Sequence, residues 1–94
     1  MLRLYWARND GLSGHVFLSM GDLADLTREM EEQGMSGWLG PKHLRAGGRV
    51  PPGAIDLALA KAGAEPRTLA DAKLWQDWLG FLRGAVENGG LVVR

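Results

Sequence analysis

The hydrophobic positions of residues 68–88 recur with the period of an α-helix. At about 100° per residue, the apolar side chains of TLADAKLWQDWLGFLRGAVEN gather on one half of the helix. These side chains are Ala72, Leu74, Trp75, Trp78, Leu79, Phe81, Leu82, Ala85 and Val86. Thr68 and Asp71 are spaced as a capping pair at the start, and Gly89 and Gly90 follow the end, where glycine commonly terminates helices. The segment predicts a long helix that buries one broad face.

Two segments near the N-terminus alternate with the period of a β-strand instead. Residues 2–7 carry apolar side chains at every second position, and residues 15–18 do the same with Val16 and Leu18. The Asn-Asp-Gly run at 9–11 favours a turn between them. The pattern predicts a β-hairpin with a loop of several residues.

Residues 19–33 predict a second helix with a narrow apolar stripe. Ser19 is placed to cap it, with Asp22 at the third position, and Gly34 is placed to end it. The stripe consists of Leu23, Leu26 and Met30. The polar side chains that we expect to face water are Arg28, Glu29, Glu31, Glu32 and Gln33.

A third helix is predicted over residues 51–64, which are rich in alanine and begin with two prolines. Gly63 is a candidate for its C-terminus, and Glu65-Pro66 would form a short connection to the long helix. Small side chains let a neighbouring helix approach closely, so we expect this helix to pack against 68–88.

The last apolar run, residues 91–93, predicts a strand that joins the hairpin. We therefore expect an α+β fold in one domain over residues 1–94. Its small antiparallel sheet, made of the N-terminal hairpin and the C-terminal strand, is packed by three helices in the order ββα-loop-ααβ.

Residues 35–53 interrupt every periodic pattern, because they contain five glycines and three prolines. Loops of this length are uncommon in compact domains unless they are functional or disordered. Trp38 and Leu39 are apolar enough to dock, so we expect an ordered loop fixed by Trp38, with a short helical turn within 41–46. The loop is the only locally basic segment, through Lys42, His43, Arg45 and Arg49.

Composition narrows the functional classes. The 94 residues are 46 % hydrophobic and 23 % charged, as in a globular protein. Eleven basic and eleven acidic residues give zero net charge, which argues against nucleic acid as the main partner. The absence of cysteine excludes disulfides and thiolate chemistry. Because neither a signal peptide nor an apolar run long enough to span a membrane is present, we expect a cytoplasmic protein without a membrane partner.

The chain carries no recognised nucleotide-binding, metalloprotease or hydrolase motif. His15 and His43 have no metal-ligand spacing with carboxylates, so we expect neither a metal nor another cofactor. His15 is interpreted as a residue of the sheet surface. His43 could serve as an acid or base over an anionic substrate, yet no orienting partner is recognisable, and no residue is assigned a catalytic role.

Gly80 and Gly84 are unexpected in a helix, where each costs about 0.5–1 kcal/mol relative to alanine. Both fall on the polar half of 68–88, one turn apart. One explanation is close approach of another backbone, from the same chain, a second copy or a partner. The other is a bend or break near Gly80. A homo-oligomer through this helix face follows from the first explanation.

We expect a protein-binding module, since small cysteine-free domains without catalytic motifs suit that role. Its most concrete form is a bacterial immunity or antitoxin-type protein that neutralises a toxin by binding; this comparison is an analogy. The candidate contact residues are Trp38, Leu39, Lys42, His43, Arg45 and Arg49, with Glu29, Glu31 and Glu32 as a second contact for a basic partner. The alternative is a small enzyme or ligand-binding domain that uses loop 35–53 over an anionic small molecule.

Overall fold

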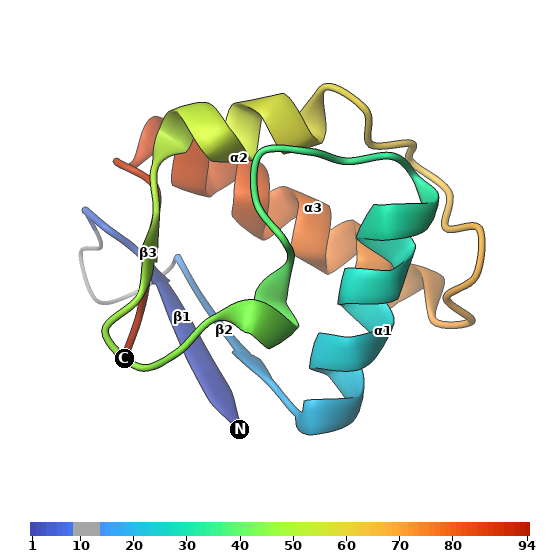
Figure 1. The fold of residues 1–94 in the computed structure, drawn as a ribbon, viewed down its shortest axis with the longest axis horizontal. Helices are drawn as coiled ribbons and strands as arrows, with labels where there is room; N and C mark the ends of the chain where they lie inside the picture. Colours follow the sequence, from blue (N-terminus) through green and yellow to red (C-terminus); the bar gives the residue numbers. More distant parts are fainter. Residues whose placement is uncertain (9–13) are drawn as a thin grey trace.

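The alternating segments pair into one sheet, and the helices cover one of its faces (Figure 1). The computed structural model describes residues 1–8 and 14–94. Within them the elements are β1 (Leu2–Trp6), β2 (His15–Leu18), α1 (Met20–Glu32), the 3-10 turn η1 (Pro41–His43), β3 (Arg49–Val50), α2 (Pro52–Leu59), α3 (Ala72–Glu87) and β4 (Leu91–Val93). The α+β class and the predicted element order are confirmed. The turn predicted at 9–11 lies outside the described residues.

The sheet is antiparallel throughout, in the order β2-β1-β4-β3. β4 joins β1, as predicted, with Leu4 opposite Val93. On its other edge β4 pairs with β3, which the sequence did not predict because two residues are too few to show alternation. Residues 47 and 48 extend this pairing, since Val93 accepts from the Gly47 N–H and donates to the Gly48 carbonyl.

Alternation along the strands decides which side chains enter the core. Leu4, Leu18, Leu91 and Val93 point to the helices and are buried there against the apolar half of α3. The indole of Trp6 lies on the same side and donates its Nε1–H to the Phe81 carbonyl at 2.9 Å. The predicted hairpin faces are therefore confirmed.

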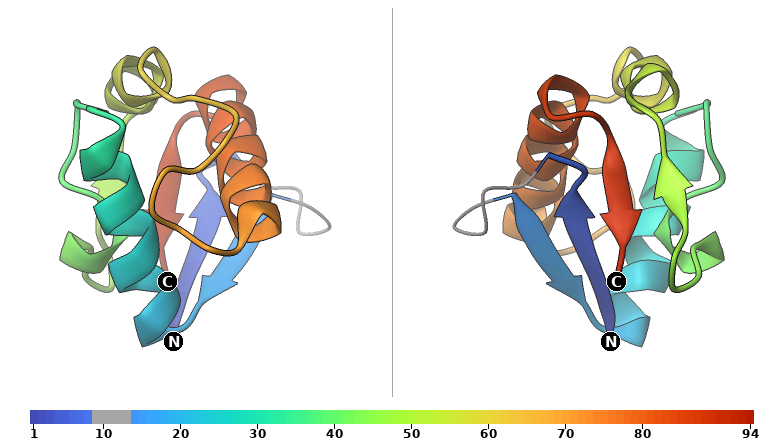
Figure 2. Two further views of the ribbon diagram at one scale, coloured as in Figure 1. Left: turned by 90° about the vertical axis from the view of Figure 1, so that its right-hand side faces the viewer. Right: turned by 90° about the vertical axis from the view of Figure 1, so that its left-hand side faces the viewer.

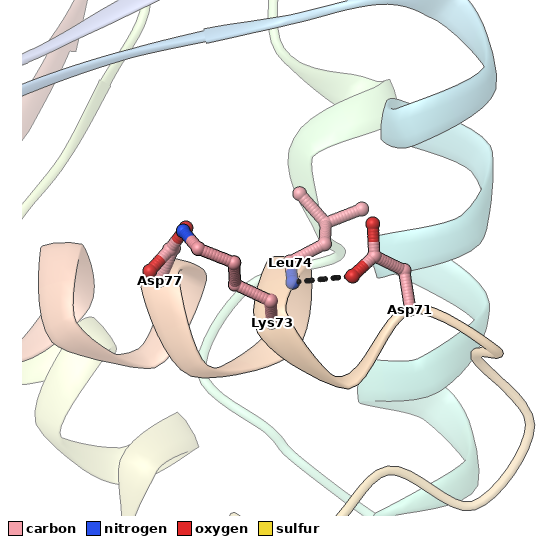
Figure 3. A network of polar contacts seen from close by, with 4 residues as sticks. All are labelled: Asp71, Lys73, Leu74 and Asp77. Atoms are coloured by element: carbon pink, nitrogen blue, oxygen red, sulfur yellow. Dashed lines mark hydrogen bonds and ion pairs between the residues drawn. The ribbon is translucent and has the colours of Figure 1, made fainter.

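The ends of α1, the start of α2 at its prolines and the end of α3 before Gly89 follow the sequence, whereas the end of α2 and the start of α3 differ from it. The Ser19 hydroxyl accepts from the Asp22 N–H, and Gly34 has a positive φ of 70° after α1. α3 begins at Ala72, where Asp71 alone caps it by accepting from the Leu74 N–H at 3.0 Å (Figure 3). The predicted Thr68–Asp71 capping pair is wrong, because Thr68 hydrogen-bonds elsewhere.

α2 ends at Leu59 rather than at Gly63, so a longer connection of residues 60–71 leads to α3. Gly63 instead contacts α3, since its carbonyl accepts the Nε1–H of Trp75 at 2.9 Å. α2 packs against α3, as predicted from its small residues.

The two helix glycines have different surroundings. A Cβ at Gly84 would collide with the Trp6 indole, whereas a Cβ at Gly80 would meet no atom within 4 Å. α3 is continuous from Ala72 to Glu87, so it does not break at Gly80. Gly84 is thus explained by close packing, but the neighbour is a side chain of the same chain and not another backbone.

Within the described residues, none of the helices has the length and apolar character needed to cross a membrane.

Candidate functional site

Loop 35–53 is an ordered structure held by two close approaches of its backbone. Gly37, at φ 113°, passes so near the Ala54 carbonyl that a Cβ there would collide with it. Gly40, at φ 107°, would place a Cβ 2.9 Å from the Thr27 side chain. Thr27 also accepts the Lys42 N–H at 3.1 Å, which fixes η1 against the middle of α1. The short helical turn expected within 41–46 is confirmed as Pro41–His43, and Trp38 packs against the core.

Trp38 connects this loop to the core. Its ring lies 6.1 Å from that of Trp78, at a tilt of 42°, and the side chain is half-buried. Neither Trp38 Nε1 nor Trp78 Nε1 has a hydrogen-bond partner among the described residues, although both atoms are buried. Trp38 therefore packs the loop against the core, and most of its ring is inaccessible to a partner.

Leu39, the next residue, is 73 % exposed. Leu39 and Trp38 both border an open groove of about 360 Å³ between the loop and the start of α2, to which His43, Leu44, Arg49 and Pro51 also contribute. Lys42, His43, Arg45 and Arg49 are all exposed. The groove brings Leu39 together with His43 and Arg49, and Lys42 and Arg45 are exposed on the same loop as a cationic rim. We call Leu39, Lys42, His43, Arg45 and the groove the loop surface.

No hydrogen-bonded catalytic constellation surrounds His43 among residues 1–8 and 14–94. Among the described residues the His43 imidazole makes no hydrogen bond that would orient it. The backbone N–H of His43 donates to the Gly40 carbonyl and closes η1. Over residues 1–8 and 14–94, no cluster of three or more histidines and carboxylates could hold a metal ion. His15 lies exposed on the sheet, where the sequence placed it.

Glu29 is the main correction to the predicted contact residues. We expected it on the water-facing side of α1, but its exposed fraction is 0 %, and Gln33 beside it is also buried. Glu29 therefore cannot contact a partner. Its only sequence signal is its place three residues after Leu26, at the edge of the apolar stripe.

The Glu29 carboxylate holds the connection between α2 and α3. One oxygen accepts from the Thr68 N–H at 2.7 Å, the Thr68 hydroxyl at 3.0 Å and the Leu69 N–H at 2.8 Å. The other accepts from the Arg67 N–H at 2.7 Å and from Gln33 Nε2 at 2.9 Å. Thr68 is committed to this carboxylate, which is why it does not cap α3.

Hydrogen bonding keeps this buried group ionised. Burial acts to raise the pKa of Glu29, but the hydrogen bonds, led by that from the Arg67 N–H, outweigh burial and lower the pKa from 4.5 to about 2. Five donors to one carboxylate compensate for its desolvation. Glu29 is thus a structural group that fixes residues 67–69 against α1.

Glu31 and Glu32 are exposed, as predicted, on the last turn of α1. The Glu32 carbonyl accepts from Arg67 Nη1, so these carboxylates border the α2–α3 connection. η1 lies against Thr27, in the middle of α1, so the acidic pair and the loop surface occupy different stretches of the helix.

Comparison of the chain with protein-family models, with curated proteins and with solved structures finds no match in any of the three.

Proposed function

We propose that this chain is a binding module that docks another protein on the loop surface. The observation that carries the proposal is the exposure of Leu39 on an ordered loop. Apolar anchors surrounded by charged residues are typical of protein interfaces. Because Gly37 and Gly40 hold the loop against Ala54 and Thr27, little conformational entropy would be lost when a partner binds.

The charges indicate the kind of partner surface. The cationic rim of the loop surface favours an acidic patch on the partner, and Glu31 and Glu32 remain candidates for a second contact with a basic one. An immunity or antitoxin-type protein, acting in the bacterial cytoplasm by binding a toxin, is the most concrete form of this proposal. Trp38 contributes by supporting Leu39.

The test uses the purified chain as bait in lysate of its source organism, with two matched variants. Leu39→Asp places a charge on the loop surface, and Leu57→Asp places one on α2, where Leu57 is likewise exposed at 61 %. We expect one stoichiometric protein that wild type and Leu57→Asp retain and Leu39→Asp loses. Equal retention by both folded variants would show that the loop surface is not the docking site.

A second candidate function is the binding of an anionic small molecule in the groove. Its volume of about 360 Å³ is within the range of ligand sites, Arg49 supplies a cationic group and His43 supplies a hydrogen-bonding imidazole. Phosphate and di- and tricarboxylates would then raise the melting temperature, and His43→Ala would abolish the shift. No shift across such a panel would exclude this function.

A further inference from the structure

The outer face of the sheet has no helix over it. In the right-hand view of Figure 2 the strands lie nearest the viewer, with the helices behind them. Side chains that alternate with the buried Leu4, Leu18 and Leu91 must point to this open side. They form two rows across the strands: His15, Tyr5, Val92 and Arg49 in one, and Phe17, Arg3 and Arg94 in the other.

Aromatic rings occupy the β2–β1 half of this face. Tyr5 lies 6.2 Å from His15 and 6.3 Å from Phe17, and His15 lies 5.2 Å from Phe17, measured between ring centroids. Phe17 is 47 % exposed. The result is a continuous aromatic patch on a regular sheet.

Arginines occupy the rest of the face. The Arg94 guanidinium lies 5.4 Å from the centre of the Tyr5 ring, Arg3 is the cross-strand neighbour of Phe17, and Arg49 is that of Val92. None of the four described strands contains an aspartate or glutamate. We call Arg3, Tyr5, His15, Phe17, Arg49 and Arg94 the sheet surface.

The zero net charge therefore conceals a segregation of charge. Every acidic residue in the described part of the chain belongs to a helix or to the α2–α3 connection: Asp22, Asp25, Glu29, Glu31, Glu32, Asp56, Glu65, Asp71, Asp77 and Glu87. Zero total charge thus does not exclude nucleic acid at this face, because phosphates respond to the local potential.

We propose that the sheet surface binds single-stranded nucleic acid, with bases stacked on Phe17 and His15 and phosphates held by the arginines. Aromatic side chains on an open sheet beside basic residues match what unpaired bases and their backbone require. A duplex does not fit, since its bases are already stacked.

The test is fluorescence anisotropy with labelled 12-mers of single-stranded RNA, single-stranded DNA and the corresponding duplexes. We expect single strands to bind more tightly than duplexes, and preference for RNA or DNA identifies the natural ligand. Phe17→Ala should weaken binding about tenfold, and Phe17→Trp should retain it. Arg3→Ala should reduce the slope of log K against log salt by about 0.7. Matched controls on the helical side, Leu57→Ala and Arg83→Ala, should bind as wild type.

Two results would overturn the proposal. One is that no single strand binds, or that duplexes and heparin bind as tightly as single strands and Phe17→Ala has no effect. The second of these patterns indicates nonspecific attraction of polyanions. The other is competition by poly-glutamate as effective as that by unlabelled oligonucleotide, which indicates an acidic protein partner. Leu39→Asp should leave oligonucleotide binding unchanged. Loss of the nucleic-acid proposal is therefore distinguishable from loss of the proposal that the loop surface docks a protein.

Discussion

Glu29→Gln tests whether a buried carboxylate fixes the α2–α3 connection. The substitution keeps the size of the side chain but removes its charge and replaces one acceptor oxygen by an NH2 group. In one orientation that NH2 group would face the N–H and hydroxyl of Thr68 and the N–H of Leu69. In the other orientation it would face the Arg67 N–H and Gln33 Nε2, so donors would oppose donors either way. We expect residues 67–69 to lose their attachment to α1.

The magnitude follows from the pKa of Glu29. Since folding lowers the pKa from 4.5 to about 2, the ionised carboxylate contributes about 3 kcal/mol to the free energy of unfolding at neutral pH. A lowered pKa means that this contribution is fully present above about pH 5 and is lost as the pH falls towards 2. By pH 3 about 2 kcal/mol of it has gone.

The assay is urea unfolding of wild type, Glu29→Gln and the exposed control Glu31→Gln at pH 7, 5, 4 and 3. We expect Glu29→Gln to be about 3 kcal/mol less stable than wild type at pH 7 and only about 1 kcal/mol less stable at pH 3. Glu31→Gln should unfold within about 0.5 kcal/mol of wild type at every pH. Comparing variants at one pH cancels the titration of the other carboxylates.

Two outcomes would refute this reasoning. If Glu29→Gln matched Glu31→Gln at pH 7, the five hydrogen bonds would contribute nothing net to stability. If Glu29→Gln were destabilised by the same amount at all four pH values, the loss would come from packing and not from the ionised state of Glu29.

Five further substitutions test the packing and the cap of α3. Gly80→Ala should stabilise the protein by about 0.5–1 kcal/mol, because its Cβ meets open space. Gly84→Ala should destabilise it by about 1–3 kcal/mol, because its Cβ collides with Trp6, and equal shifts in melting temperature would contradict this contrast. Trp38→Ala should lower the free energy of unfolding in urea by about 2 kcal/mol, because it removes the contact with Trp78. Leu39→Ala should lower it by less than about 0.5 kcal/mol. The reverse order would show that Trp38 is the exposed anchor. Asp71→Ala should cost about 1 kcal/mol by uncapping α3, and an unchanged melting temperature would argue against the cap seen in Figure 3.

Local periodicity was sufficient to predict most of the fold. The two-residue alternation of β1 and the 3.6-residue period of α3 each record which side of an element is buried, so strands, helices and their inner faces followed from the sequence. Ser19 and Gly34 bounded α1 correctly because cap geometry depends on neighbours along the chain. The order of loop 35–53 was also predictable, since Trp38 needed an apolar contact.

Contacts between residues distant in sequence decided everything else. β3 exists because β4 pairs with it, and Glu29 is buried because residues 67–69 bring their N–H groups to it. The roles of Thr68 and Gly63 were predicted wrongly for the same reason. The Thr68 hydroxyl donates to Glu29, 39 positions away, and the Gly63 carbonyl accepts from Trp75, 12 positions away. The sheet surface likewise required the structure, because β1, β2 and β4 bring Tyr5, Phe17 and Arg94 together while helices collect the acidic residues. Total charge depends on sequence alone, but the potential at a surface depends on where the fold places each charge.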